Sequence, residues 1–387
     1  GAAISGTMQV IGENVCGMDV KAKFDGGKVV NSPELEWRVK TYQNWRDGEN
    51  GAIVVQSNVE DTRFGVLEYA ISDLELDAVE LKWGQGAKDI GGEVKITDLA
   101  KAKLLKKRGY IVLPNPEDPE VVRAFKAGHF KDFERHSRVG MVTEEGFVSR
   151  VKELRNLGAK YIFLKTGAYR PADLARAVKF SSIARIDLLT VDGAGGGTGM
   201  SPWNMMNEWG IPSVEIWSLT YQYVDRLAKR GDYVPSIALA GGITMEDHIF
   251  KALALGAPYV KAIGMARAPI TSAMVAKNVG SRIMKGDLPV YYGRYGSTIE
   301  SIFVEASRMK KKLGKRFEKL PTGALGLYSY NQRLAQGLRQ LMCGARKFGI
   351  QHITRRDIAA LTSEAAQISG IEHVVEADKE EVERILS

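Results

Sequence analysis

The sequence predicts an α/β fold, a (β/α)8 TIM barrel with a mainly helical C-terminal extension. From about residue 50 onward, short apolar runs alternate with helical segments of about 10–15 residues, a pattern typical of a parallel sheet. The strand-like runs number about eight, which favours a closed barrel over an open doubly wound sheet. The late runs 236–240 and 259–264 end in glycines and bracket one helix, as in barrels that hold a phosphate.

The individual elements follow from the apolar runs in chain order. The expected strands are 4–9, 52–56, 78–82, 110–114, 160–165, 186–191, 236–240 and 259–264. Helices are expected over 147–157, 172–180 and 221–230, and between the last two strands. Residues 1–270 would form the barrel, and residues 271–387, interrupted by Pro289 and Pro321, would form a helical extension packed on it.

Composition and charge narrow the class of protein. The 387 residues are 44% hydrophobic and 26% charged, which suits a soluble protein with a sizeable core. The net charge of +8 is spread along the chain except for a basic run at 308–316. We interpret this run as a solvated helix face or as a surface that attracts an acidic redox partner, rather than a nucleic-acid or membrane site.

Targeting signals and metal-ligand patterns are missing from the sequence. No apolar run has the length of a bilayer span and no signal peptide is visible, so we expect a cytoplasmic protein. The chain begins at Gly1 without Met, which leaves open whether an upstream piece was trimmed. Cys16 and Cys343 are too few to ligate an iron–sulfur cluster within this chain, and five scattered histidines argue against zinc.

A lysine-bearing loop follows the expected strand 78–82. Barrel enzymes build their active face from the loops after the strands, so this loop is expected there. Lys82 and Lys88, with Gln85 between them and glycines around them, have the groups needed to clamp a dicarboxylate. The alternative is that both lysines are ordinary surface charges.

Lys165 ends an otherwise apolar strand. A lysine at the top of a barrel strand points to a role at the active face, and if a flavin were bound there, the charge would stabilise the reduced ring. The alternative is a lysine that extends out of the barrel mouth into solvent. Two further candidates are His136, between two arginines in a long loop, and Ser201, whose hydroxyl would lie near a flavin or substrate.

A glycine-rich segment follows the strand 186–191. Five glycines within the seven residues 193–199 leave bare backbone N–H groups that a ligand can approach closely. A second glycine turn at 241–242 follows the next expected strand, and Gly264 and Met265 follow the last one. These turns predict a site for a phosphorylated cofactor.

Taken together, these residues resemble the FMN-binding domain of glutamate synthase and the short stand-alone glutamate synthase-like proteins of anaerobic prokaryotes. The matching motifs are 82–92, Lys165, 192–202, 241–257 and the opening 6–8, in the family's order across residues 1–270. The resemblance implies a barrel that binds FMN and combines 2-oxoglutarate with ammonia. It also implies that hydride from flavin N5 reduces the resulting 2-iminoglutarate to L-glutamate.

The resemblance also assigns roles by position. Lys82, Lys88 and Lys165 would be catalytic, and the substrate would contact Lys82, Gln85, Lys88, Glu93, His136 and Ser201. The cofactor would be bound by Lys165 together with Thr7, Met8, Asp192, Gly193, Gly195, Gly196, Gly197, Thr198, Gly199, Gly241, Gly242, Gly264 and Met265.

The chain departs from the family in several respects. Nothing resembles the N-terminal glutaminase domain, and the segment 266–274 lacks the three cysteines that ligate an iron–sulfur cluster in the full enzyme. Glu93 stands where the family has a glutamine, and a carboxylate there would repel an anionic substrate but accept an amine. We therefore expect FMN, no iron–sulfur cluster in this chain, a keto-acid substrate with ammonia, and a redox partner such as ferredoxin.

Other readings of the same residues stay open. The chain would also suit a flavoenzyme that acts on another amino acid, for example an N-alkylglutamate, as Glu93 favours. It would equally suit a non-catalytic FMN electron-relay subunit, or a phosphosugar barrel without flavin. We expect a homo-oligomer with neither a nucleic-acid nor a membrane partner.

Overall fold

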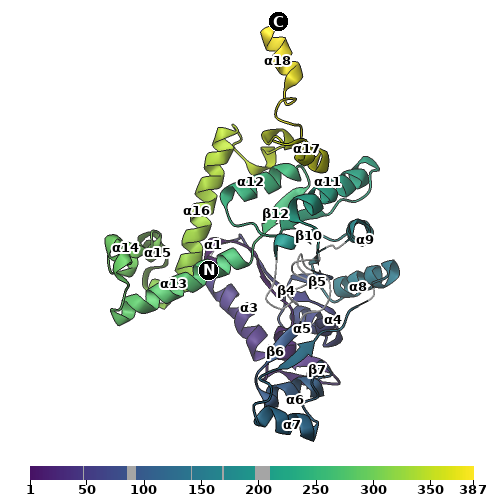
Figure 1. Ribbon diagram of the computed structural model, residues 1–387, viewed down its shortest axis with the longest axis vertical. Helices are drawn as coiled ribbons and strands as arrows, with labels where there is room; N and C mark the ends of the chain where they lie inside the picture. Colours follow the sequence, from purple (N-terminus) through teal and green to yellow (C-terminus); the bar gives the residue numbers. More distant parts are fainter. Residues whose placement is uncertain (47, 85–92, 141, 168–169, 197–209) are drawn as a thin grey trace.

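The computed structural model describes residues 1–46, 48–84, 93–140, 142–167, 170–196 and 210–387 (Figure 1). Its centre is a parallel sheet of seven strands in the order β1-β4-β5-β9-β10-β11-β12. The strands are β1 (Gln9–Ile11), β4 (Ile53–Ser57), β5 (Ala78–Lys82), β9 (Tyr161–Gly167), β10 (Leu188–Asp192), β11 (Ser236–Ala240) and β12 (Val260–Gly264). Six of the predicted strands are thereby confirmed in type and approximate position.

The order of the strands is that of a barrel. Each strand of the sheet pairs in parallel with the strands before and after it in the chain, from β1 to β12. A doubly wound sheet would instead reverse its order at a switch point. Among the described residues the sheet has seven strands rather than the expected eight, and β1 and β12 are its edges.

The sheet is curled around an apolar layer. Val54, Ala78, Phe163, Leu188 and Ala238 form one buried cluster, against which Val10 of β1 and Ala262 of β12 also pack. Every strand of the sheet therefore contributes one side chain to the same cluster. Because the two edge strands take part, the face of the sheet that carries these residues is concave.

Helices cover the opposite, convex face. The alternate strand residues, such as Val55, Val79, Leu164, Leu189 and Leu239, belong to the main core together with the helices between the strands. These helices are α3 (Pro33–Trp45), α4 (Val59–Arg63), α5 (Val66–Ser72), α8 (Glu144–Asn156), α9 (Pro171–Ile183), α11 (Ser213–Lys229) and α12 (Glu246–Leu255). Burial on both faces explains why these strands read as continuous apolar runs.

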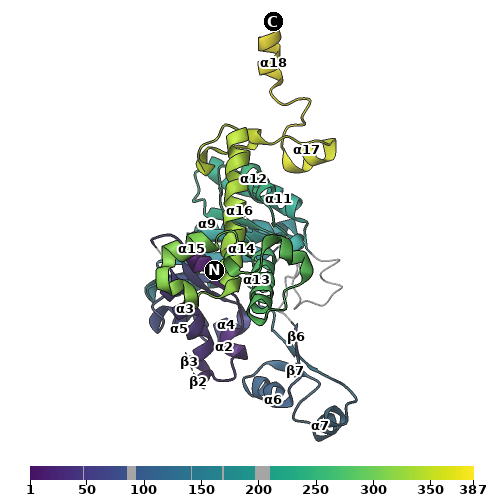
Figure 2. The ribbon, with the colours of Figure 1, turned by 90° about the vertical axis from the view of Figure 1, so that its left-hand side faces the viewer.

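The predicted strand 110–114 does not belong to the central sheet. Its residues form β7 (Ile111–Leu113), which pairs antiparallel with β8 (Phe133–His136) in a sheet with β6 (Glu93–Ile96). Ile111 and Leu113 are 44% and 53% exposed while Val112 is buried, so only one face of this strand is covered. With α6 (Leu99–Lys107) and α7 (Pro119–Lys126), these strands make a small lobe that projects from the sheet (Figure 2).

The predicted opening strand is also displaced. Residues 2–5 form α1 (Ala2–Ser5), which ends at Gly6 in the left-handed conformation with φ 67°. Glycine adopts this conformation without a Cβ penalty and commonly ends helices. The first strand therefore starts only at Gln9. A short helix α2 (Val15–Met18) and a hairpin of β2 (Lys23–Asp25) and β3 (Lys28–Asn31) follow it.

Helices make up the regular structure that follows β12. They are α13 (Arg267–Lys285), α14 (Ile299–Ile302), α15 (Ala306–Leu313), α16 (Thr322–Gly344), α17 (Ser363–Ser369) and α18 (Lys379–Leu386), with the 3-10 turns η2 (Val290–Tyr295), η3 (Gly314–Lys319), η4 (Ile350–His352) and η5 (Arg355–Asp357). α13 and α16 approach so closely that a Cβ on Gly326 would lie 2.1 Å from the Cβ of Ala276. Across the described ranges, no helix is long and apolar enough to cross a membrane.

Candidate functional site

Charged side chains occupy the concave face beyond the apolar layer. Because side chains alternate along a strand, Glu80 and Lys82 share the face of Ala78, and Lys165 shares that of Phe163. In β10, Asp192 likewise lies on the face of Leu188. Lys82, Lys165 and Asp192 lie toward the carboxyl ends of their strands, where α/β barrels place their active sites, and Glu80 lies in the middle of β5. We refer to the carboxyl end of the concave face as the mouth. The charged residues there are called the mouth cluster, which consists of Glu13, Glu80, Lys82, Lys165 and Asp192.

Lys165 is held as a partly buried cation. Its Nζ lies 3.3 Å from Asp192 Oδ2, and the two side chains are 23% and 6% exposed. Burial opposes its charge, but the carboxylates of Asp192 and Glu80 outweigh burial and raise the pKa of Lys165. Lys165 thus carries a fixed positive charge on the concave face rather than extending into solvent.

Glu80 is a site residue that the sequence analysis missed. Its side chain is 2% exposed and accepts a hydrogen bond from Gln56 Nε2 on the neighbouring strand. Burial raises the pKa of Glu80, while Lys165 and the Gln56 hydrogen bond oppose that rise. The available signal in the sequence was a charged residue in the middle of an apolar strand. It was overlooked because the residues around it form an ordinary apolar strand pattern.

Lys82 is paired within the chain. Its Nζ lies 3.0 Å from Glu13 Oε2, with side-chain exposures of 7% and 14%. Glu13 follows β1 and was not predicted as a site residue. The proposed dicarboxylate clamp therefore contains a lysine that already has a carboxylate partner. Its other members, Gln85 and Lys88, lie outside the described residues.

The turns after β10 and β11 pack backbone against backbone. Gly193 N donates to Ala240 O at 2.9 Å, and Ser213 Oγ donates to Gly241 O at 2.7 Å. Gly241 has φ 121°, and a Cβ there would lie 2.7 Å from Gly193 N. At Gly242, with φ 85°, a Cβ would touch Gly195 O at 3.4 Å. These two turns can approach each other only because both are built from glycine.

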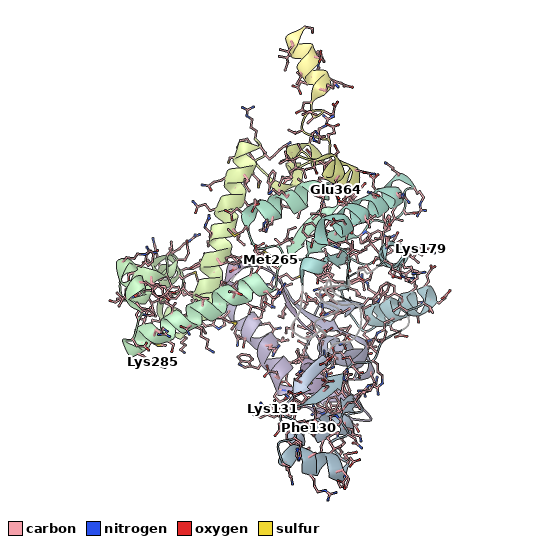
Figure 3. The ribbon with its side chains drawn as sticks, viewed as in Figure 1. Phe130, Lys131, Lys179, Met265, Lys285 and Glu364 are labelled. Atoms are coloured by element: carbon pink, nitrogen blue, oxygen red, sulfur yellow. The ribbon has the colours of Figure 1, made fainter. Side chains whose placement is uncertain are left out.

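The head of α13 lies beside these turns. Arg267, its first residue, donates from Nη2 to Gly195 O at 3.0 Å in the turn η1 (Ala194–Gly196). Met265 lies at this end of the helix (Figure 3). Within the described part of the chain, no side chain caps the N-terminus of α13. An uncapped helix N-terminus next to glycine turns is a favourable place for an anion.

The remaining predicted residues lie in the small lobe, at the amino end of β1 or outside the described residues. Glu93 and His136 are cross-strand partners in β6 and β8 of the small lobe, and His136 Nε2 lies 3.4 Å from Glu134 Oε2. Thr7 and Met8 precede β1 and so lie at its amino end, whereas the mouth cluster lies at the carboxyl ends. The residues outside the described ranges also include Gly197, Thr198, Gly199 and Ser201.

A buried polar cluster lies next to Glu13 in the chain. Asp61 Oδ2 accepts the backbone N–H of Asn14 at 2.8 Å, and the fully buried Arg135 attracts the same carboxyl group. Burial, opposed by the Asn14 hydrogen bond and reinforced by Glu13, raises the pKa of Asp61 to about 7. The carboxyl group of Asp61 thus keeps its proton to higher pH in the folded state.

This raised pKa makes stability depend on pH. An unfolded aspartate loses its proton near pH 4, so the stability that Asp61 contributes is complete below about pH 4 and is lost as pH rises from there to about 7. Because a change of one in pKa corresponds to about 1.4 kcal/mol, the lost stability amounts to as much as about 4 kcal/mol. We expect Asp61→Asn to remove this pH dependence. The measurement is the free energy of urea unfolding of wild type and of the variant, each at pH 4 and at pH 8. Asp77→Asn, at an exposed aspartate, is the matched control, and parallel curves for wild type and Asp61→Asn would refute the assignment.

Comparisons with known proteins bear on the same region. Residues 134–278 match the family model described as the conserved region in glutamate synthase, a span that includes Lys165, Asp192 and both glycine turns. A curated relative is the archaeal glutamate synthase [NADPH] of Methanocaldococcus jannaschii, 28% identical over 232 residues, or 59% of this chain. The chain spans 39% of that relative's length.

Two solved structures are distantly similar. FabK from Thermotoga maritima matches with 10% identity and a TM-score of 0.38 over 89% of this chain and 97% of that chain. The monotopic membrane protein (S)-mandelate dehydrogenase matches with 13% identity and a TM-score of 0.40 over 82% and 68%. The sequence matches show that this chain is similar to glutamate synthases over a segment that contains Lys165 and Asp192.

Proposed function

We propose that this protein is an FMN-dependent oxidoreductase of the glutamate synthase class. It would reduce 2-iminoglutarate, formed from 2-oxoglutarate and ammonia, to L-glutamate with electrons from a separate redox partner. One observation carries the proposal. The family-matched segment contains both the partly buried, cationic Lys165 and two glycine turns beside the uncapped N-terminus of α13. The closed eight-stranded barrel and the cytoplasmic location stay predictions.

The residues fit a flavin mononucleotide at its phosphate end. Backbone N–H groups of Gly241, Gly242 and Met265, with the N-terminus of α13, would surround the phosphate, and the glycine turns leave no side chain in its way. Arg267 adds a positive charge at the same place. The chemistry that FMN supplies when bound is hydride transfer to the C=N bond of the substrate.

The chain's own residues would prepare the site for that reaction. Lys165, kept charged by Asp192 and Glu80, would hold its ammonium against the flavin ring and favour negative charge there. The substrate would lie over the same mouth, where Lys82 is the described lysine of the clamp. Roles for Gln85, Lys88 and Ser201 stay predictions of the sequence.

The deciding experiment is an anaerobic half-reaction. The FMN-loaded protein is reduced with dithionite, 2-oxoglutarate and ammonium are added, and the flavin absorbance is followed. Reoxidation that requires both additions and yields L-glutamate is the expected result. Bound flavin that ignores the pair would favour another imine substrate or an electron-relay subunit, and a protein that binds no FMN would refute the proposal.

A second candidate is favoured by the Glu13–Lys82 pair. Glu13 neutralises Lys82 at 3.0 Å, so this side of the mouth offers a carboxylate as well as an ammonium, and it suits an amine-bearing substrate such as an N-alkylated amino acid. The two candidates share the flavin site and differ in the charge of the substrate.

Glu13→Gln distinguishes them. If the substrate is the dicarboxylic keto acid, releasing Lys82 from Glu13 should lower KM for 2-oxoglutarate by about tenfold or more, since a charge-assisted contact is worth roughly 1.5–3 kcal/mol. If the substrate is an amine, the same change should raise its KM. Steady-state kinetics with both substrates decides, and Glu49→Gln, at an exposed glutamate, is the control. An unchanged KM for both substrates would exclude Glu13 from substrate binding.

A further inference from the structure

Two apolar surfaces in the C-terminal region have no partner among the described residues, and their chemistry is complementary. The first is helix α18, which lies beyond α17 at the far end of the molecule (Figures 1 and 2). The second is a groove of about 340 Å³ between α13 and η2. Both views place α18 well away from α13, so the groove of the same copy is out of its reach.

Helix α18 is amphipathic and fully exposed. Val382, Ile385 and Leu386 are 44%, 73% and 79% exposed, and their spacing of three and four residues puts them on one face. The helix has eight residues. Isolated helices shorter than about 12–15 residues are marginal in water, so α18 needs an apolar surface to keep its helical form.

The groove offers such a surface. It is lined by Met274, Val275, Pro289 and Tyr291 together with Arg282. Met274, Val275 and Tyr291 are 66%, 51% and 68% exposed, although they lie side by side. An exposed apolar patch of this kind, with a polar rim, marks an interaction site.

The charges on the two surfaces indicate which segment binds in the groove. The segment 376–387 carries five acidic and two basic residues, and Lys379 is already paired with Glu376 at 2.9 Å. The exposed face of α13 carries Arg282 and Lys285, the latter at its outer end (Figure 3). Packing α13 against α13 of another copy would bring these cations together, whereas packing α18 against it brings unlike charges together.

We propose that α18 of one copy docks in the α13–η2 groove of a second copy, and that two copies exchange these helices reciprocally. One helix of eight residues covers little surface, and a two-fold dimer makes the contact twice. The apolar side chains of Val382, Ile385 and Leu386 enter the groove, and the acidic side chains lie along Arg282 and Lys285. This dimer is independent of the chemistry at the mouth cluster.

Light scattering on the full 387-residue chain tests the exchange. Wild type should be a dimer, and Ile385→Asp and Met274→Asp should each raise the dimer dissociation constant by tenfold or more. Leu361→Asp, at an apolar residue that is 77% exposed and belongs to neither surface, should leave it unchanged. The three positions are exposed, and circular dichroism confirms that the variants fold.

Mixing the two variants gives the specific signature. Ile385→Asp has an intact groove and Met274→Asp an intact α18, so the mixed dimer keeps one of the two contacts and should associate more tightly than either variant alone. A monomeric wild type would overturn the proposal. So would a mixture no tighter than its components, or dissociation by Met274→Asp with none by Ile385→Asp, which would indicate α13 packing on itself.

Discussion

Lys165→Met is expected to abolish turnover and to lower the free energy of unfolding by about 3–5 kcal/mol, the usual cost of removing one partner of a buried ion pair. The variant would leave Asp192, 6% exposed, without its cation, and it would remove one of the two lysines that stabilise the charge of Glu80, 2% exposed. The loss of stability is measured by urea unfolding, and the loss of function by the anaerobic half-reaction. If FMN binds beside Lys165, the reduction potential of the bound flavin should also fall, because a positive charge next to the ring is lost.

A double variant separates the two effects. Lys165→Met combined with Asp192→Asn removes the uncompensated charge, so part of the lost stability should return while turnover stays absent. Lys160→Met, at a lysine 69% exposed and paired with Asp77, is the control and should change neither quantity appreciably. Lys165→Met with wild-type stability and an unchanged flavin potential would show that Lys165 is a peripheral lysine.

Gly241→Ala is expected to abolish FMN binding. At φ 121°, a Cβ on Gly241 would lie 2.7 Å from Gly193 N and 2.7 Å from Ser213 Oγ, so the turns after β10 and β11 must separate. Separating them displaces the backbone N–H groups proposed to bind the phosphate. Fluorescence titration with FMN at a temperature where the variant is folded measures the effect, and retained stoichiometric binding would contradict it.

Gly231→Ala isolates the cost of backbone strain. Gly231 also has positive φ, 76°, but a Cβ there would meet no atom within 4 Å. This variant should lose roughly 1–2 kcal/mol of stability from the left-handed conformation and still bind FMN. The contrast between the two glycines attributes the loss of binding to the contact between the turns.

Prediction from sequence succeeded where a strand is covered on both faces. Residues 78–82 and 186–191 read as short apolar runs because helices pack on one side of them and the concave cluster on the other. The assignment of 110–114 to the central sheet was wrong. This run is equally apolar, but only one face of the strand is covered. A short apolar run records that a strand is buried, and it does not say which sheet the strand joins.

The site was predictable in part for the same reason. Lys165 and Asp192 stand out because each is a charged residue toward the carboxyl end of a buried strand. Glu13 follows a strand of three residues whose start had been placed too early, at a segment that folds as α1. Its partnership with Lys82 joins positions 69 residues apart in the chain, and no local pattern contains such a pair.

By itself, the sequence determined the alternation of strands and helices, the two glycine turns and the charged ends of the strands, since each depends on neighbours along the chain. Only the tertiary structure decided which carboxylate meets which lysine, because burial and pairing depend on strands that are brought together by the curled sheet. It also decided that Glu93 and His136 are cross-strand partners in β6 and β8. Register between strands is set by packing over the whole molecule, and the sequence carries it only through that packing.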